Sequence, residues 1–155
     1  MNKLKWILGG LFLIAVPLFA VSQLAHAQRF ATTIDDDQVV HSSLYSAGQN
    51  ITIKGEIFGD VFCAGQTVKV DATVHGDVIC AGQDVTISGK IDGDIRAAGQ
   101  EMSVNAETTG SMTLAGSGVS LDAEARVGRD LTATGQELNI KGQVGRDAVG
   151  DERGA

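Results

Sequence analysis

Apolar and polar residues alternate along most of the chain, in short stretches that are separated by turn signals. In residues 60–76 (DVFCAGQTVKVDATVHG) the apolar positions are Val61, Cys63, Val68, Val70, Ala72 and Val74. A period of two predicts strands with one buried face, and no stretch of this region keeps the 3.6-residue spacing of a helix. We therefore expect an all-β fold built from short strands.

This pattern returns every 17 residues. Two series of glycines keep the interval: Gly48, Gly65, Gly82, Gly99 and Gly116, and Gly59, Gly76, Gly93 and Gly110. A glutamine follows the first series at positions 49, 66, 83 and 100, but a serine stands at 117. The unit that begins at Ser111 also carries two extra residues, which we expect at Ala125-Arg126. A fixed period of this kind indicates a solenoid.

Short strands that recur in register can bury a common face by winding into a coil, in which each strand pairs with its equivalents in the neighbouring turns. The sequence therefore predicts a single-stranded parallel β-helix, triangular in cross-section, with about six turns of 17 residues. Parallel crossovers favour a right-handed coil. Val68, Val85 and Met102 should lie over one another. The corner glycines are expected to adopt backbone angles that are closed to other residues, and stacked glutamines to bond amide to amide.

The first 27 residues have the organisation of a secretory signal peptide. Lys3 and Lys5 precede an apolar stretch, residues 6–21, and Ala25-His26-Ala27 supplies the small-x-small cleavage pattern. The stretch is shorter than the ~20 residues that span a bilayer. We expect cleavage between Ala27 and Gln28, with an uncleaved membrane anchor as the alternative. The protein is then exported and periplasmic, extracellular or associated with the cell envelope.

The remaining chain divides into three parts. Residues 28–42 are expected to cap the N-terminal end, with Thr32–Val40 forming a partial first turn. Residues 43–150 form the repeat domain, and residues 151–155 are a C-terminal tail. Asp35, Asp36 and Asp37 place negative charge at one end, and Asp151 and Glu152 place it at the other.

Composition narrows the function. The chain has 155 residues, 12 Lys and Arg against 19 Asp and Glu, and a net charge of −7, which becomes −9 when residues 1–27 are removed with their two lysines. This balance argues against a nucleic-acid binder, which must neutralise phosphates. Only 5% of the residues are aromatic. A narrow core of small aliphatic side chains accounts for that shortage.

The repeated [AT]-G-Q and V-x-G-D-[VI] units resemble the bactofilins, polymer-forming bacterial scaffold proteins, and most closely their exported relatives with a signal peptide. The resemblance covers residues 34–150. It implies a right-handed triangular β-helix that joins end to end into filaments and is not an enzyme. We therefore expect a non-enzymatic scaffold of the cell envelope without cofactors or a small-molecule substrate, whose partners are other copies of itself, envelope components or the membrane. The alternative is a polysaccharide-binding or carbohydrate-active β-helix.

Asp60, Asp77 and Asp94 are predicted to stack as a column of carboxylates at one corner. Such a column could gather cations, since calcium takes carboxylate and carbonyl oxygens. The interpretation we favour is that aspartate after glycine suits a turn.

Cys63 and Cys80 occupy the same inward position in adjacent turns. Strand spacing places their Cα atoms about 4.8 Å apart, which is within disulfide range. Their Cβ bonds should run parallel, however, and the equivalent position holds ordinary core residues such as Ala97. We therefore expect two buried thiols, with a disulfide as the alternative.

Aromatic and aliphatic side chains are also predicted to form outward ladders. Tyr45, Phe62 and Ile79 share one outward position in three successive turns, and Phe58 lies at another between His41 and His75. Such a ladder is either a partner surface or a set of side chains that shield one another. Both interpretations stay open. No serine or cysteine nucleophile of recognisable pattern accompanies the histidines, so no catalytic residue is assigned.

Overall fold

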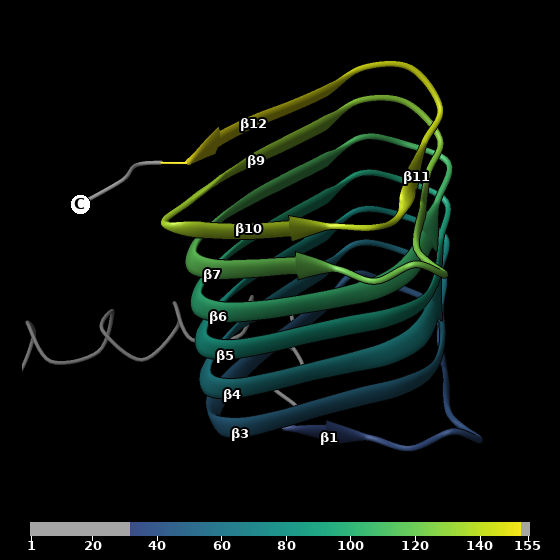
Figure 1. Ribbon diagram of the computed structural model, residues 1–155. Helices are drawn as coiled ribbons and strands as arrows, with labels where there is room; N and C mark the ends of the chain where they lie inside the picture. The colour runs from purple at the N-terminus through teal and green to yellow at the C-terminus, as the bar shows by residue number, and fades with distance from the viewer. Residues whose placement is uncertain (1–31, 153–155) are drawn as a thin grey trace, which may run out of the picture.

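A computed structural model describes residues 32–152, and the elements in this range are β-strands (Figure 1). Their bounds are β1 Thr33–Ile34, β2 Val39–Val40, β3 Leu44–Ile57, β4 Val61–Val74, β5 Val78–Ile91, β6 Ile95–Thr108, β7 Met112–Leu121, β8 Arg126–Val127, β9 Leu131–Gly135, β10 Glu137–Ile140, β11 Gln143–Val144 and β12 Ala148–Glu152. Within these residues the structure has no helix that is long and apolar enough to cross a membrane. The expected signal peptide and its cleavage site at Ala27 and Gln28 lie outside the described residues.

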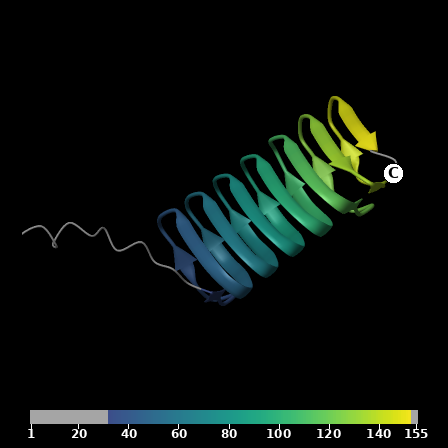
Figure 2. The same cartoon turned by 90° about the vertical axis from the view of Figure 1, so that its left-hand side faces the viewer.

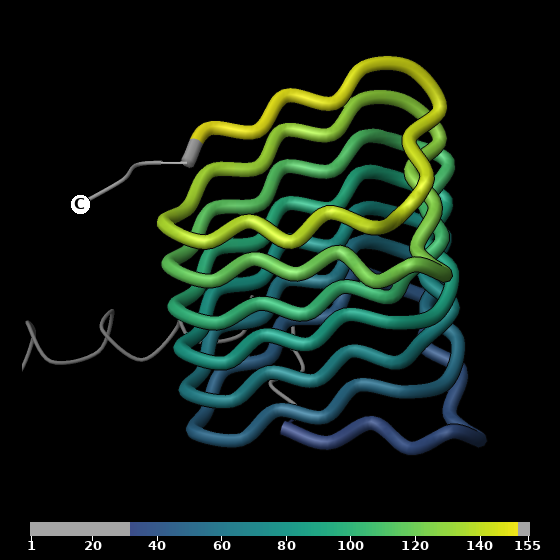
Figure 3. The backbone as a smooth tube through the Cα atoms, in the orientation of Figure 1, coloured from purple at the N-terminus to yellow at the C-terminus, as the bar shows by residue number. Residues whose placement is uncertain are grey.

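The strands wind into a solenoid of parallel strands with a spacing of about 17 residues, as the sequence predicts. Val68 pairs with Val85, and Val85 pairs with Met102, so equivalent residues do lie over one another. The coil is right-handed: as it rises in Figure 1, it runs from left to right along the near side and returns along the far side (Figures 1 and 3). About seven turns are present. This number is close to the predicted six: β1 and β2 form the expected partial first turn, and β12 begins a further one.

Each turn has three faces. We call the positions equivalent to 61–64 the first face, those equivalent to 67–70 the second face and those equivalent to 73–75 the third face. In Figure 1, the first face lies at the rear with β9 and β12, the second at the front with β10, and the third at the right with β11. The aspartate corner precedes the first face, the glutamine corner lies between the first and second faces, and we call the remaining corner, at positions equivalent to 71–72, the third corner.

The core is a column of small aliphatic side chains from all three faces. Val61, Val70, Ile87 and Val104 are completely buried, and two polar residues, Ser46 and Thr108, are buried among the described residues. Alternation places every second residue of a strand inside. In β4 the buried residues are those at positions 61, 63, 68, 70, 72 and 74, so alternation is interrupted at the glutamine corner and continues through the third corner.

Two local expectations were wrong. Of the two residues expected to be extra, Ala125 is buried and Arg126 pairs with Glu107, so both occupy regular positions. The extra length lies in the turn that begins at Asp122 and is closed by a hydrogen bond from the Ala125 amide to the Asp122 carbonyl. Positive φ values are confined, among the described glycines, to Gly55 (78°) and Gly89 (95°) at the third corner.

The glycines at the glutamine corner are required for a different reason, which is close stacking. A Cβ atom on Gly65 would lie 2.5 Å from the Gly48 carbonyl oxygen of the turn below.

Candidate functional site

The aspartate corner is a ladder of side chain to backbone hydrogen bonds. The amide of Asp77 donates to Asp60 Oδ1 (2.9 Å), and the amide of Asp94 donates to Asp77 Oδ1 (2.8 Å). The amide of Ser111 continues the ladder to Asp94 Oδ1 (2.9 Å). Each carboxylate therefore satisfies a corner amide of the next turn that would otherwise lack an acceptor.

Arg96 pairs with the outer oxygens of two carboxylates of this column, those of Asp77 and Asp94. Its guanidinium lies 3.1 Å from Asp94 Oδ2 and 3.7 Å from Asp77 Oδ2. The column that the sequence offered as a cation site is thus formed, but its carboxylates are bound to amides and to an arginine. Within residues 32–152, no group of three or more His, Cys, Asp or Glu side chains is arranged to hold a metal ion.

Cys63 and Cys80 are joined by a disulfide, so the expectation of two thiols was wrong. Their Cα atoms lie 4.5 Å apart as partners in the register of β4 and β5. Rotation about the two Cα–Cβ bonds lets the sulfurs converge even though the Cβ bonds start parallel. The disulfide lies just inside the first face.

The first face is mostly apolar on its outer surface through its first five turns, with Arg96 and Thr113 as the polar exceptions. One outward column consists of Tyr45, Phe62, Ile79, Arg96 and Thr113, and the other consists of Ala47, Ala64, Ala81, Ala98 and Ala115. The five alanines are exposed, whereas Tyr45, Phe62 and Ile79 are half-buried. The rings of Tyr45 and Phe62 stack at 4.9 Å with planes 6° apart. They shield one another and still form a projecting ridge beside the alanines.

Two shallow hollows accompany this ridge. One of about 280 Å³ is lined by Tyr45, Phe62, Cys63, Ala64 and Ile79. The other, of about 360 Å³, extends over Ala81, Ala98 and Ala115. Alanine in each of the first five turns leaves this strip of the sheet lower than the ridge.

The third face carries a second aromatic column. Phe58 stacks between His41 (5.3 Å) and His75 (4.5 Å), as its sequence position predicts. The two nitrogens of His75 also reach carboxylates of the turns below and above: Nε2 lies 2.9 Å from Glu56 Oε1, and Nδ1 lies 2.7 Å from Asp92 Oδ2. These hydrogen bonds, that with Glu56 first, raise the pKa of His75 above its ordinary 6.5.

We expect the imidazole of His75 to titrate above pH 6.5 in the folded protein, measured by NMR. A raised pKa means that the charged ring stabilises the fold fully below pH 6.5, and that this stabilisation is lost as the pH rises through the folded pKa. Glu56→Gln keeps a side chain of the same size but removes the charge, and it should lower the midpoint. An unchanged midpoint in Glu56→Gln would show that this contact is absent in solution.

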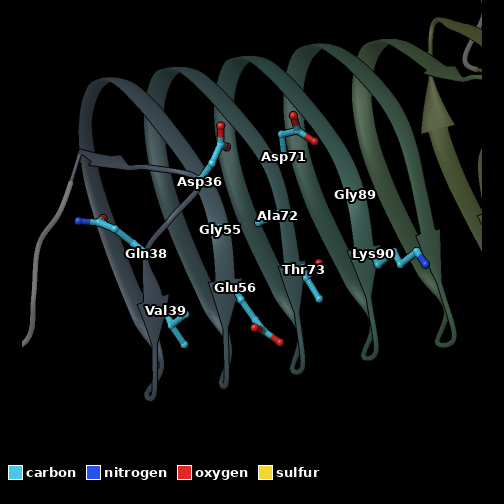
Figure 4. A pocket seen from close by; sticks show the side chains of 10 residues that line it. All are labelled: Asp36, Gln38, Val39, Gly55, Glu56, Asp71, Ala72, Thr73, Gly89 and Lys90. Atoms are coloured by element: carbon cyan, nitrogen blue, oxygen red, sulfur yellow. The ribbon is translucent and has the colours of Figure 1, made fainter.

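A concave region of about 540 Å³ lies at the third corner, beside the turn at residues 35–38 (Figure 4). Its floor is formed by Gly55, Ala72 and Gly89, and its rim carries Asp36, Glu56, Asp71 and Lys90, as the sticks in Figure 4 show. Lys54 pairs with Asp36 at 3.3 Å. This hollow was not predicted from the sequence, although two signals were present: the small residues at the corner, and the two residues that lengthen the 35–38 turn relative to the other units.

The C-terminal end of the solenoid differs from its middle. Within the described residues, β10, β11 and β12 each pair with a single strand, which is β7, β8 and β9 respectively. In each case the partner belongs to the preceding turn, so the last turn has neighbours on one side only among these residues (Figure 2). The inward residues of this layer are accessible: Ile140 is 37% exposed, whereas Leu121 directly below it is fully buried. Leu138 and Val144 are half-buried and Ala148 is exposed. An apolar layer therefore coincides with the outer edges of β10 and β11, which have no further partner within residues 32–152.

Comparison of the chain with protein-family models, curated proteins and solved structures finds no match.

The described residues thus form three surfaces that can contact a partner: the first face, the hollow at the third corner and the C-terminal end. Of the predicted partner-surface residues, Tyr45, Phe62 and Ile79 come together on the first face, whereas Phe58 lies apart on the third face. One glutamine contact has the predicted form, with Gln66 Nε2 donating to Gln83 Oε1 at 3.1 Å.

Proposed function

We propose that this chain is a non-enzymatic scaffold of the bactofilin type, exported to the cell envelope, which assembles into filaments through contacts at both ends of its solenoid, one of them the C-terminal end. The observation that carries the proposal is the coincidence of Ile140 with the outer edges of β10 and β11, which pair only with β7 and β8 among residues 32–152. An exposed strand edge is a template for another strand. Burial of the apolar layer beneath it would favour the same contact.

Charge opposes this contact and sets its conditions. With a net charge of −9 for residues 28–155, copies repel one another at long range. Salt shortens the range of that repulsion to about 10 Å at 0.1 M. Assembly is therefore expected to increase with ionic strength, whereas contacts held by ion pairs would weaken.

Electron microscopy of the purified protein tests the proposal. We expect filaments at moderate salt, and we expect Ile140→Asp to abolish them because it places a charge in the contact layer. Asn139→Asp is the matched control, since Asn139 is the exposed neighbour of Ile140 on β10 and, like Ile140, lies over a residue of β7. Filaments from Ile140→Asp, or single rods from the unsubstituted protein at high concentration and in salt, would refute end-to-end assembly.

Polysaccharide binding is the alternative, and less supports it. Sugar rings commonly pack on the faces of aromatic side chains, but Tyr45 and Phe62 stack on each other. The hollow at the third corner has no aromatic residue among its lining residues. Defined binding on a glycan array would favour this alternative over the scaffold.

A further inference from the structure

The first face differs from the other two faces in carrying a single charged side chain through its first five turns. Among its ten outward positions in the first five turns, Arg96 is the one charged residue, and it is paired with Asp77 and Asp94 of its own chain. The second face presents Lys69, Asp84 and Glu101, and the third presents Glu56, Lys90 and Glu107. In a chain with this net negative charge, the first face is where a like-charged copy can approach at least electrostatic cost.

The relief of the first face is complementary to itself. Its ridge (Tyr45, Phe62, Ile79) runs along the side nearer the aspartate corner, and its alanine strip runs along the side nearer the glutamine corner. A two-fold axis parallel to the rod superposes the ridge of one copy on the alanine strip of the other, turn for turn. Phe62 then faces Ala64 of the second copy and enters the hollow of about 280 Å³ that Ala64 lines, which is the knob-and-hole relation of an isologous interface.

Charge complementarity selects the same axis. With the two rods parallel, the aspartate corner of each copy (Asp60, Asp77, Asp94) lies opposite the glutamine corner of the other (Gln66, Gln83, Gln100), whose amides are exposed. Each amide has two N–H donors, so a donor remains beside the Gln66–Gln83 bond. With the rods antiparallel, aspartate corners would face one another and repel.

We propose that the first face binds the first face of a second copy of this chain, with the two rods parallel and in the same register. The contact is lateral and separate from the end contact, so it would pair filaments side by side. Its apolar part, five strands at ~4.8 Å by four residues at ~3.3 Å, covers about 300 Å² per copy, well below the ~800 Å² of a standard interface. Isolated rods therefore pair weakly, and repetition along a filament strengthens the pairing.

Photo-crosslinking tests the proposal and its register. Phe62→p-benzoylphenylalanine is made in the Ile140→Asp chain, so that end-to-end assembly does not contribute, and labelled and unlabelled chains are mixed to identify crosslinks between copies. We expect a dimer whose crosslink joins position 62 to residues 61–64 of the second copy. The same photoreactive residue at Thr86, an exposed position of the second face in the neighbouring turn, should give no dimer.

Substitution supplies the second arm. Ala81→Arg places a charge in the middle of the alanine strip and should lower the crosslinked dimer at least tenfold, whereas Thr86→Arg adds the same charge to the second face of the same turn and should leave it unchanged. A crosslink to a different turn, no dimer, or a dimer unaffected by Ala81→Arg would overturn the proposal. Filament loss in Ile140→Asp is scored separately by microscopy, so the two contacts can fail independently.

Discussion

Replacing Gly93 by alanine is expected to lower the free energy of unfolding by about 3 kcal/mol. The added Cβ would overlap Asp77 Oδ1 and would lie 2.6 Å from the Gly76 carbonyl oxygen. Backbone of the turn below cannot move aside without shifting the whole stack. Displacing the Asp77 carboxylate would also remove the acceptor of the Asp94 amide (2.8 Å). Urea unfolding followed by circular dichroism measures the change.

Gly118→Ala is the matched control. Its Cβ would meet the carboxylate of Glu101, the far end of a flexible side chain that can turn into solvent. Alanine also restricts the unfolded chain more than glycine does, so this variant should be neutral or more stable by about 0.5 kcal/mol. If both variants lost the same stability, loss of glycine in general, and not the close packing at the aspartate corner, would be responsible.

Reduction of the Cys63–Cys80 disulfide is expected to lower the free energy of unfolding by about 3 kcal/mol. The bond closes a loop with a sequence separation of 17 and so removes conformations from the unfolded chain. The folded turns stay in register after reduction, because the strand pairing of β4 and β5 holds the two residues together without it. Urea unfolding with and without reductant gives the difference.

The double variant Cys63→Ala and Cys80→Ala supplies the control for reductant. Alanine is the residue at the equivalent position 97, so the core accepts it, and the stability of this variant should not depend on reductant. Identical unfolding of the unsubstituted protein in both conditions, with two thiols titrating before reduction, would contradict the disulfide.

The course of the chain could be predicted because the 17-residue repeat determines which residues lie over one another in successive turns. A core residue such as Val85 must lie over Val68 if both are inward residues of units 17 apart, and the structure has this pairing. Alternation identifies the inward side, and glycine marks the corners. No long-range contact outside this rule is needed to build the solenoid.

What the period could not give was the detail of contacts between turns. The sequence shows that glycine precedes aspartate, but only coordinates show that the Asp77 carboxylate occupies the space beside Gly93. The two extra residues were predicted at Ala125-Arg126, but they lie in the turn that begins at Asp122. The sequence pattern alone does not show which residues of this stretch keep the regular positions. The prediction of two thiols at Cys63 and Cys80 was wrong because residue spacing gives the distance between Cα atoms but not the side-chain rotamers that bring the sulfurs together. The hollow at the third corner depends on a turn outside the regular repeat.

Each turn contacts only the turns directly below and above it. The length of the solenoid can therefore change in steps of one whole turn. Inserting or deleting one complete unit would change the height of the rod by ~4.8 Å and leave every corner and face aligned. A partial unit would rotate all later residues out of alignment. Duplication of whole units is therefore the way in which such a gene can be lengthened without disrupting the fold, and the number of units sets the length of the rod.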